Sequence, residues 1–164
     1  MWTSGPDLPF YSLFDHCQVL LGDTVYITGG GQRKTLKLTR DGNWVEVGSL
    51  SVARDDFACA VHAEKIFVIG GSGSDADLSS VEIFDPASET WTFGPEFPQA
   101  LHRAQAVSWD GSLWVMGGWN RTISGYNDML YRLEENVWKN TEITVLAHWG
   151  ALPALIVDND IINC

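Results

Sequence analysis

Three short apolar runs in this chain each end at a pair of glycines, and a tryptophan follows each pair at a similar distance. The glycine pairs are Gly29-Gly30, Gly70-Gly71 and Gly117-Gly118. The tryptophans are Trp2, Trp44, Trp91 and Trp138, which lie 42, 47 and 47 residues apart. Self-similarity at a period of this size predicts a repeat architecture, in which one supersecondary unit recurs along the chain.

Composition narrows the fold class and the kinds of partner. The chain has 164 residues, of which 45% are hydrophobic, so it can bury a sizeable core. Short apolar runs bounded by turn residues recur throughout, without the spacing of an amphipathic helix, which predicts an all-β fold. A net charge of −11 argues against nucleic acid and anionic membranes as partners, because both attract Lys and Arg.

The second copy of the repeat reads as four strands. We expect them at residues 44–47, 57–62, 66–69 and 81–84. Residues 72–80 form a polar loop, and residues 85–89 have the composition of a turn. A sheet of this size cannot cover both of its own faces, whereas radial repetition of such sheets does.

The repeated residues have readable physical roles. An apolar run such as residues 66–69 predicts a strand buried on both faces. Glycine pairs allow positive φ angles and a close approach of backbones where the chain leaves a crowded centre. Each tryptophan is large enough to fill the space between neighbouring sheets. We therefore treat as structural the glycine pairs and Trp44, Trp91 and Trp138.

These marks resemble the kelch repeat of β-propellers. Phe84 and Trp91 have the family's aromatic spacing, as do Tyr131 and Trp138, while the first copy has Leu38 at the aromatic position. Arg54 matches the arginine that precedes the second strand in the family, and Arg103 is a possible counterpart in the third copy. The resemblance implies an all-β kelch-type propeller fragment made of four-stranded antiparallel blades.

The repeats do not complete a ring. They cover residues 2–43, 44–90, 91–137 and an incomplete fourth copy at 138–164, while propellers have roughly four to eight blades. We expect one partial propeller domain that belongs to a longer chain. Two alternatives stay open: two copies assemble into one ring, or the strand at Trp2 closes an open four-bladed form against the C-terminal hairpin.

The three cysteines, Cys17, Cys59 and Cys164, form neither a zinc-binding pattern nor an even set for disulfides. Cys17 and Cys59 fall at similar places in successive repeats, which we expect to be too far apart to bond. Buried free thiols favour a reducing compartment, and we predict a cytoplasmic location. The N-terminal residues lack the pattern of a signal peptide. An extracellular location remains the alternative if a leader precedes them.

The loops that follow the glycine pairs, and the connections that follow the tryptophans, lie on one rim of such a fold. On this rim we expect residues 31–35 to form a basic surface and residues 72–80, with Asp75 and Asp77, an acidic one, while residues 119–128 combine two aromatic residues with an arginine. Trp, Tyr and Arg dominate binding hot spots. The predicted partner contacts are Trp119, Arg121 and Tyr126, followed by Arg33 and Lys34. In the alternative interpretation, Trp119 only caps its blade.

Other candidate residues point to structure rather than chemistry. We expect Arg54, Arg103 and His102 to be structural or solvated, and we discount the glycosylation sequon at Asn120. His16, His62, His102 and His148 are scattered through the repeats without metal-ligand spacing, and Asp55-Asp56 resembles a solvated turn more than an acid/base pair. We therefore predict no catalytic residue, metal or cofactor.

The resemblance implies a non-enzymatic protein-interaction module. Many kelch propellers serve in substrate adaptors of ubiquitin ligases or in cytoskeletal proteins, and we expect a protein partner bound through the rim loops. The alternative is a propeller of an enzyme or of a small-molecule (sugar) binder, whose site lies outside this fragment.

Overall fold

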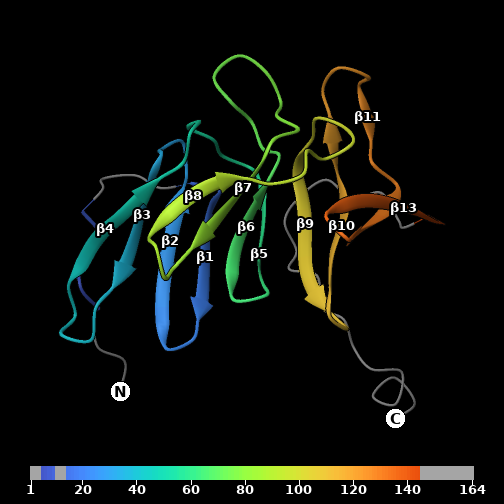
Figure 1. Cartoon of the computed structure of the whole chain (residues 1–164). Helices are drawn as coiled ribbons and strands as arrows, with labels where there is room; N and C mark the ends of the chain where they lie inside the picture. The colour runs from blue at the N-terminus through green and yellow to red at the C-terminus, as the bar shows by residue number, and fades with distance from the viewer. Residues whose placement is uncertain (1–4, 10–13, 145–164) are drawn as a thin grey trace, which may run out of the picture.

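The computed structural model describes residues 5–9 and 14–144, which contain three antiparallel sheets (Figure 1). Blade 1 consists of β1 (His16–Leu21), β2 (Thr24–Gly29), β3 (Lys34–Leu38) and β4 (Trp44–Ser49). Blade 2 consists of β5 (Ala58–His62), β6 (Lys65–Ile69), β7 (Val81–Asp85) and β8 (Thr90–Phe93). Blade 3 consists of β9 (His102–Trp109), β10 (Ser112–Asn120), β12 (Met129–Glu134) and β13 (Val137–Thr144), with the short β11 (Gly125–Tyr126) beside β10.

Each blade is a meander in which consecutive strands pair. The first strands of the blades are neighbours, with β1 beside β5 and β5 beside β9. Backbone hydrogen bonds link the residues just before or at the start of these strands: Asp56 N donates to Asp15 O at 3.3 Å and Arg103 N donates to Asp56 O at 2.5 Å. All three residues have φ between 52° and 57°. The three blades therefore repeat one backbone arrangement around their inner strands.

The all-β prediction is confirmed, and the predicted strands of the second copy match β4 to β7 closely. Trp44, Trp91 and Trp138 each lie on the last strand of a blade, namely β4, β8 and β13. Each blade therefore ends with the strand at which we began a new repeat in the sequence. Trp2 and residues 145–164, with most of the predicted fourth copy, lie outside the described residues.

The glycine pairs permit contacts that a side chain would block. A Cβ on Gly70 would lie 2.5 Å from the carbonyl oxygen of Leu101 in the next blade. A Cβ on Gly118 would lie 2.9 Å from the carbonyl oxygen of His102. Both glycines also have positive φ, 64° and 92° respectively. The repeated Gly-Gly therefore marks the place where backbones crowd together, as the sequence predicts.

The tryptophans fill the space between blades and also bond across it. The indole N–H of Trp91 in blade 2 donates to Thr35 Oγ1 of blade 1 at 2.9 Å. The indole N–H of Trp138 in blade 3 donates to Pro95 O, which follows β8, at 2.9 Å. Buried indole groups need such partners because an unbonded N–H inside the core destabilises the fold.

The aromatic residues with the same spacing in the second and third copies occupy different places in their blades. Phe84 lies opposite Trp91 in blade 2. In blade 3, Leu133 lies opposite Trp138 and Tyr131 lies opposite Asn140, because the turn between β12 and β13 is shorter. The number of residues between the aromatic residue and the tryptophan includes the turn between their strands. Equal spacing in the sequence therefore gives different cross-strand partners when the turns differ in length.

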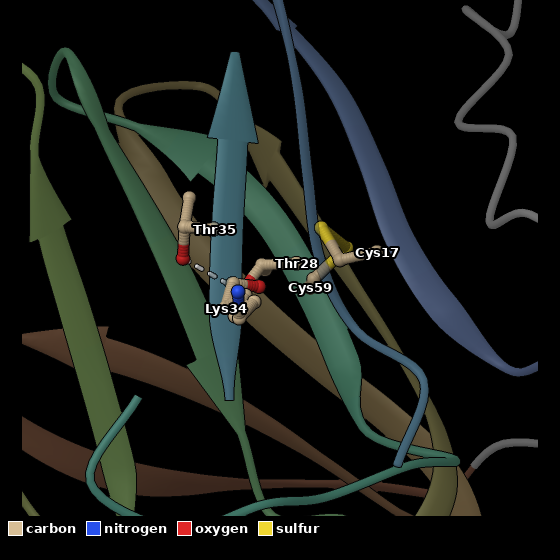
Figure 2. Close-up of a disulfide and its surroundings, with 5 residues drawn as sticks. All are labelled: Cys17, Thr28, Lys34, Thr35 and Cys59. Atoms are coloured by element: carbon tan, nitrogen blue, oxygen red, sulfur yellow. Dashed lines mark hydrogen bonds between the residues drawn. A yellow bond between two sulfur atoms is a disulfide. The ribbon is translucent and has the colours of Figure 1, made fainter. Parts of the chain in front are cut away.

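The prediction for Cys17 and Cys59 is wrong, since the two residues form a disulfide with a Cα–Cα distance of 6.0 Å (Figure 2). Cys17 lies opposite Thr28, just before Gly29, whereas Ala58 lies opposite Ile69, just before Gly70. Cys17 thus corresponds to Ala58, and Cys59 is offset by one residue. Side chains alternate along a strand, so this offset turns the two thiols toward each other.

The disulfide removes the free-thiol argument for a reducing compartment, because disulfides persist in oxidising environments. The cytoplasmic location and its extracellular alternative therefore both stay predictions. Among the described residues there is no helix with the length and hydropathy needed to span a bilayer.

Arg54 has the structural role that we predicted. Its side chain is 0% exposed and pairs with Glu82 at 2.7 Å in blade 2. The guanidinium also donates to Gly70 O at 2.9 Å and to Ser80 O at 3.0 Å. Burial lowers the pKa of Arg54, an effect that the charge of Glu82 opposes. From its buried position, Arg54 therefore links the segment before β5 to both ends of the β6–β7 loop.

Candidate binding surface on the rim

The rim is the edge of the blades where the inner strands begin, at the top of Figure 1. The β6–β7 loop and the β10–β11 hairpin project from this edge. The β2–β3 loop of blade 1 lies on the same edge, because strand direction alternates in each meander. The predicted contact residues therefore share one edge of the molecule, though not one patch.

In blade 3 the strand continues beyond the glycine pair, where we predicted a loop. Trp119 on β10 pairs with Tyr126 on β11, and their rings meet edge to face at 4.7 Å between centroids. Arg121 lies at the turn of this hairpin, with 57% of its side chain exposed. Tyr126 and Ile123 are 45% and 66% exposed. The hairpin thus presents an arginine and apolar surface from regular backbone.

Two asparagines hold the hairpin in shape. Asn120 Oδ1 accepts hydrogen bonds from the backbone N–H groups of Thr122 at 2.9 Å and Ile123 at 3.2 Å. Asn127 Nδ2 donates to the carbonyl oxygens of Gly117 and Met129, both at 3.0 Å. Asn120 is buried, so its sequon lacks the exposed acceptor that a glycan needs.

Asp77 joins blade 2 to this hairpin. Its Oδ2 accepts the backbone N–H of Arg121 at 2.9 Å, and its Oδ1 lies 3.0 Å from His102 Nδ1 and 3.4 Å from Arg121 Nη2. Only 2% of the Asp77 side chain is exposed. The prediction of an acidic loop surface at Asp75 and Asp77 is therefore wrong for Asp77, whose charge is directed into blade 3.

Arg33 and Lys34 form a separate patch on blade 1. Arg33 Nε donates to Leu50 O at 2.6 Å, and Lys34 pairs with Glu46 at 2.8 Å. Both residues are exposed and line a shallow pocket with Gly31, Gln32, Ser49 and Ala53. Blade 2 lies between this patch and the hairpin of blade 3. The structure brings Trp119, Arg121 and Tyr126 together and leaves Arg33 and Lys34 apart.

A second feature of the rim was missed from the sequence. A cavity of about 270 Å³ lies where the inner strands begin, lined by Asp15, His16, Asp56, Phe57, Arg103, Ala104 and Gln105. Arg103 Nε donates to Asp56 Oδ2 at 2.9 Å. Gln105 lies opposite Met116, just before Gly117, as Ala58 lies opposite Ile69, just before Gly70. Counting back along the strands, Arg103 corresponds to Asp56 and Leu101 to Arg54, which corrects the suggestion that Arg103 matches Arg54.

Charge is concentrated at this cavity. Burial and the neighbouring carboxylates Asp56 and Asp15 raise the pKa of Asp55. The hydrogen bond to Asp56 raises the pKa of Arg103. Asp55 and Asp56 thus belong to a structured charge network, rather than to the solvated turn that we predicted. Within residues 5–9 and 14–144 no cluster of three His, Cys, Asp or Glu side chains is arranged to hold a metal.

Comparison with known proteins agrees with the fold and the repeat. The model of the Kelch motif matches residues 53–98, which include all of blade 2. An F-box/kelch-repeat protein of Arabidopsis thaliana is 37% identical over 112 residues, covering 65% of this chain and 30% of the relative. Kelch-like protein 35 of Homo sapiens is 32% identical over 71% of this chain and 21% of its own length. The chain belongs to the kelch-repeat family.

The solved structure of YjhT shares the fold with this kelch chain. Its TM-score is 0.76 at 18% sequence identity, and the match covers 84% of this chain and 53% of YjhT. The kelch chain therefore spans about half of that structure and under a third of the two curated relatives.

Proposed function

We propose that this kelch chain is a non-enzymatic scaffold that binds a protein partner through its rim. The observation that carries the proposal is the β10–β11 hairpin, which presents Arg121, Tyr126 and Ile123 to solvent from a backbone held by Asp77. Arg and Tyr are frequent binding hot spots, and an ordered hairpin loses little conformational entropy on binding.

Trp119, Arg121 and Tyr126 are the first contacts in this proposal. Trp119 packs edge to face against the Tyr126 ring, so it limits the rotation of Tyr126 even where it does not touch the partner. Arg33 and Lys34 form a second contact patch for a partner large enough to span blade 2. Asp77 positions Arg121, and we assign it no direct contact.

The finer proposal is a role as a substrate adaptor of a ubiquitin ligase, with a cytoskeletal role as its alternative. The relatives named F-box/kelch-repeat and Kelch-like protein support a scaffold role within a larger assembly. The chain matches only part of these relatives, so the adaptor role depends on the whole protein.

A second candidate is a binding site for a small polar molecule at the inner-strand cavity. Asp15, Asp56 and Arg103 line this cavity and offer both charges to a ligand such as a sugar or a zwitterion. Calorimetric titration with such ligands tests this candidate separately from protein capture.

Capture of partners by the full chain tests the rim. Arg121→Ala with Tyr126→Ala removes two exposed side chains from the hairpin and should reduce recovery of a specific partner at least about tenfold, as expected for hot-spot residues. Quantitative mass spectrometry measures the recovery, and thermal melting checks that the variant folds.

Trp109→Ala is the matched control for this experiment. Trp109 is also an exposed aromatic residue of blade 3, at 49%, but it lies at the opposite end of β9 from the rim. The control should recover the same partners as the natural sequence. Equal recovery by the rim variant and by the control would overturn the proposal.

A further inference from the structure

The disulfide lies at the interface between blades 1 and 2. The equivalent positions at the interface between blades 2 and 3 hold two residues that cannot form a covalent bond. Cys17 corresponds to Ala58, and Cys59, opposite Val68, corresponds to Ala106, opposite Val115. The contact between blades 2 and 3 therefore has Ala58 and Ala106 where the contact between blades 1 and 2 has the two cysteines. Both alanines belong to or pack against an apolar core cluster.

The two interfaces indicate that blades pack on one another without a disulfide. Small apolar side chains at these two positions suffice to pack one blade on another, as Ala58 and Ala106 do. Two thiols are similar in size and polarity to such side chains, because free cysteine behaves as a small hydrophobe. Reduced blades 1 and 2 can therefore stay packed, with the core around Tyr26 and Phe84 in place.

We propose that the Cys17–Cys59 disulfide is a redox-sensitive lock on the interface between blades 1 and 2. Closed, it ties β1 to β5 close to the Asp56 N to Asp15 O hydrogen bond at the mouth of the inner cavity. Blades 2 and 3 have a different tie at the rim, through Asp77. Opening the lock thus loosens blade 1, with Arg33 and Lys34, and leaves the hairpin of blade 3 in place.

The lock operates by thiol–disulfide exchange with glutathione. To close, one protein thiolate attacks glutathione disulfide and releases one glutathione, and the second protein thiolate then attacks the mixed disulfide and releases another. The reverse reaction consumes two glutathione molecules and yields one glutathione disulfide. Cys17 is 2% exposed and Cys59 is partly exposed, so exchange begins at Cys59.

The test compares the oxidised and reduced forms of the 164-residue chain carrying Cys164→Ala, which removes the third thiol. The chain is equilibrated in mixtures of glutathione and glutathione disulfide, and alkylation with mass spectrometry measures the fraction closed. Reduction should lower the melting temperature by about 10 °C, the size expected for a loop closed over 42 residues. Hydrogen exchange should accelerate in β1 and remain unchanged in the second half of β9.

Cys17→Ala with Cys59→Ala, in the same background, is the matched control because it copies the Ala58 and Ala106 pair. It should melt at the temperature of the reduced chain, and adding reductant should not change that melting temperature. A Cys59→Ser variant makes the same comparison if the alanine pair folds poorly. Equal melting temperatures of the oxidised and reduced chain, or thiols that stay free in glutathione disulfide, would overturn the lock.

Discussion

Blades 2 and 3 share one backbone plan but stabilise it with different chemistry. Blade 2 buries the ion pair of Arg54 and Glu82, in which Arg54 also donates to two carbonyl groups. In blade 3 the corresponding positions hold Leu101 and Tyr131, as the register of Glu82 opposite Val68 and of Tyr131 opposite Val115 indicates. An uncharged pair therefore replaces a charged pair at the same place.

The replacement shows which features of the blade the backbone demands. Gly70 and Gly118 occupy places where any side chain would meet a carbonyl oxygen. The buried ion pair is one solution among others, which agrees with the general finding that apolar residues of similar volume can replace buried ion pairs. The two blades also differ at the rim, where blade 2 has a loop and blade 3 has a paired hairpin.

Breaking the ion pair on one side should give the largest effect. Glu82→Ala leaves the buried guanidinium of Arg54 without its partner, and we expect a loss of about 3–5 kcal/mol in the free energy of unfolding. Urea denaturation followed by tryptophan fluorescence measures it. The double variant Arg54→Leu with Glu82→Tyr copies blade 3 and should lose less than Glu82→Ala. A double variant less stable than Glu82→Ala would contradict the comparison.

Gly70→Ala should come next. The new Cβ would meet the Leu101 carbonyl oxygen at a φ of 64°, and we expect a loss of roughly 2–3 kcal/mol. Gly22→Ala is the control, because Gly22 has a similar φ of 60° with nothing within 4 Å of the added Cβ. It should lose only about 1 kcal/mol, the cost of the backbone conformation. Equal losses would show that crowding between blades is unimportant.

Asp77→Ala tests the tie between blades 2 and 3. It removes the acceptor of the Arg121 N–H and the buried partner of His102, and we expect a loss of about 1–3 kcal/mol. Hydrogen exchange should accelerate at Arg121 and in the hairpin of residues 119–126. Asp75→Ala is the control, because Asp75 is exposed on the same loop. An unchanged hairpin in Asp77→Ala would mean that blade 3 holds its hairpin alone.

The smallest effect concerns His62 at the other end of the same interface. Burial lowers its pKa below 6.5, and its Nδ1 lies 2.8 Å from Ser108 Oγ of blade 3. The unfolded chain therefore binds the proton more readily, so His62 lowers stability as the pH falls through 6.5 and below. His62→Gln should lose less stability than the natural sequence between pH 7.5 and 5. Identical pH profiles of melting temperature would contradict this.

Local residue patterns were enough to predict the blades. Apolar runs such as residues 66–69 are buried strands, and Gly70 and Trp91 have the roles that their types and spacing indicate. The predictions went wrong where a side chain's partner lies in another blade. Asp77 was predicted as a surface charge, and Arg103 was aligned with the wrong residue. The contacts of Asp77 with His102 and of Arg103 with Asp56 join residues far apart in the chain, so the neighbouring sequence does not indicate them.

The sequence by itself determined the repeat, the all-β class and the crowded glycine and tryptophan positions, because these follow from local sterics and from the alternation of apolar residues. Only the tertiary structure decided which side chains meet across blades. A shift of one residue in register turns a side chain to the other face of its strand. The repeat period varies by several residues between copies, so it cannot place a residue to within one position. Cys17 and Cys59 were therefore predicted to lie apart, whereas they are bonded in the fold.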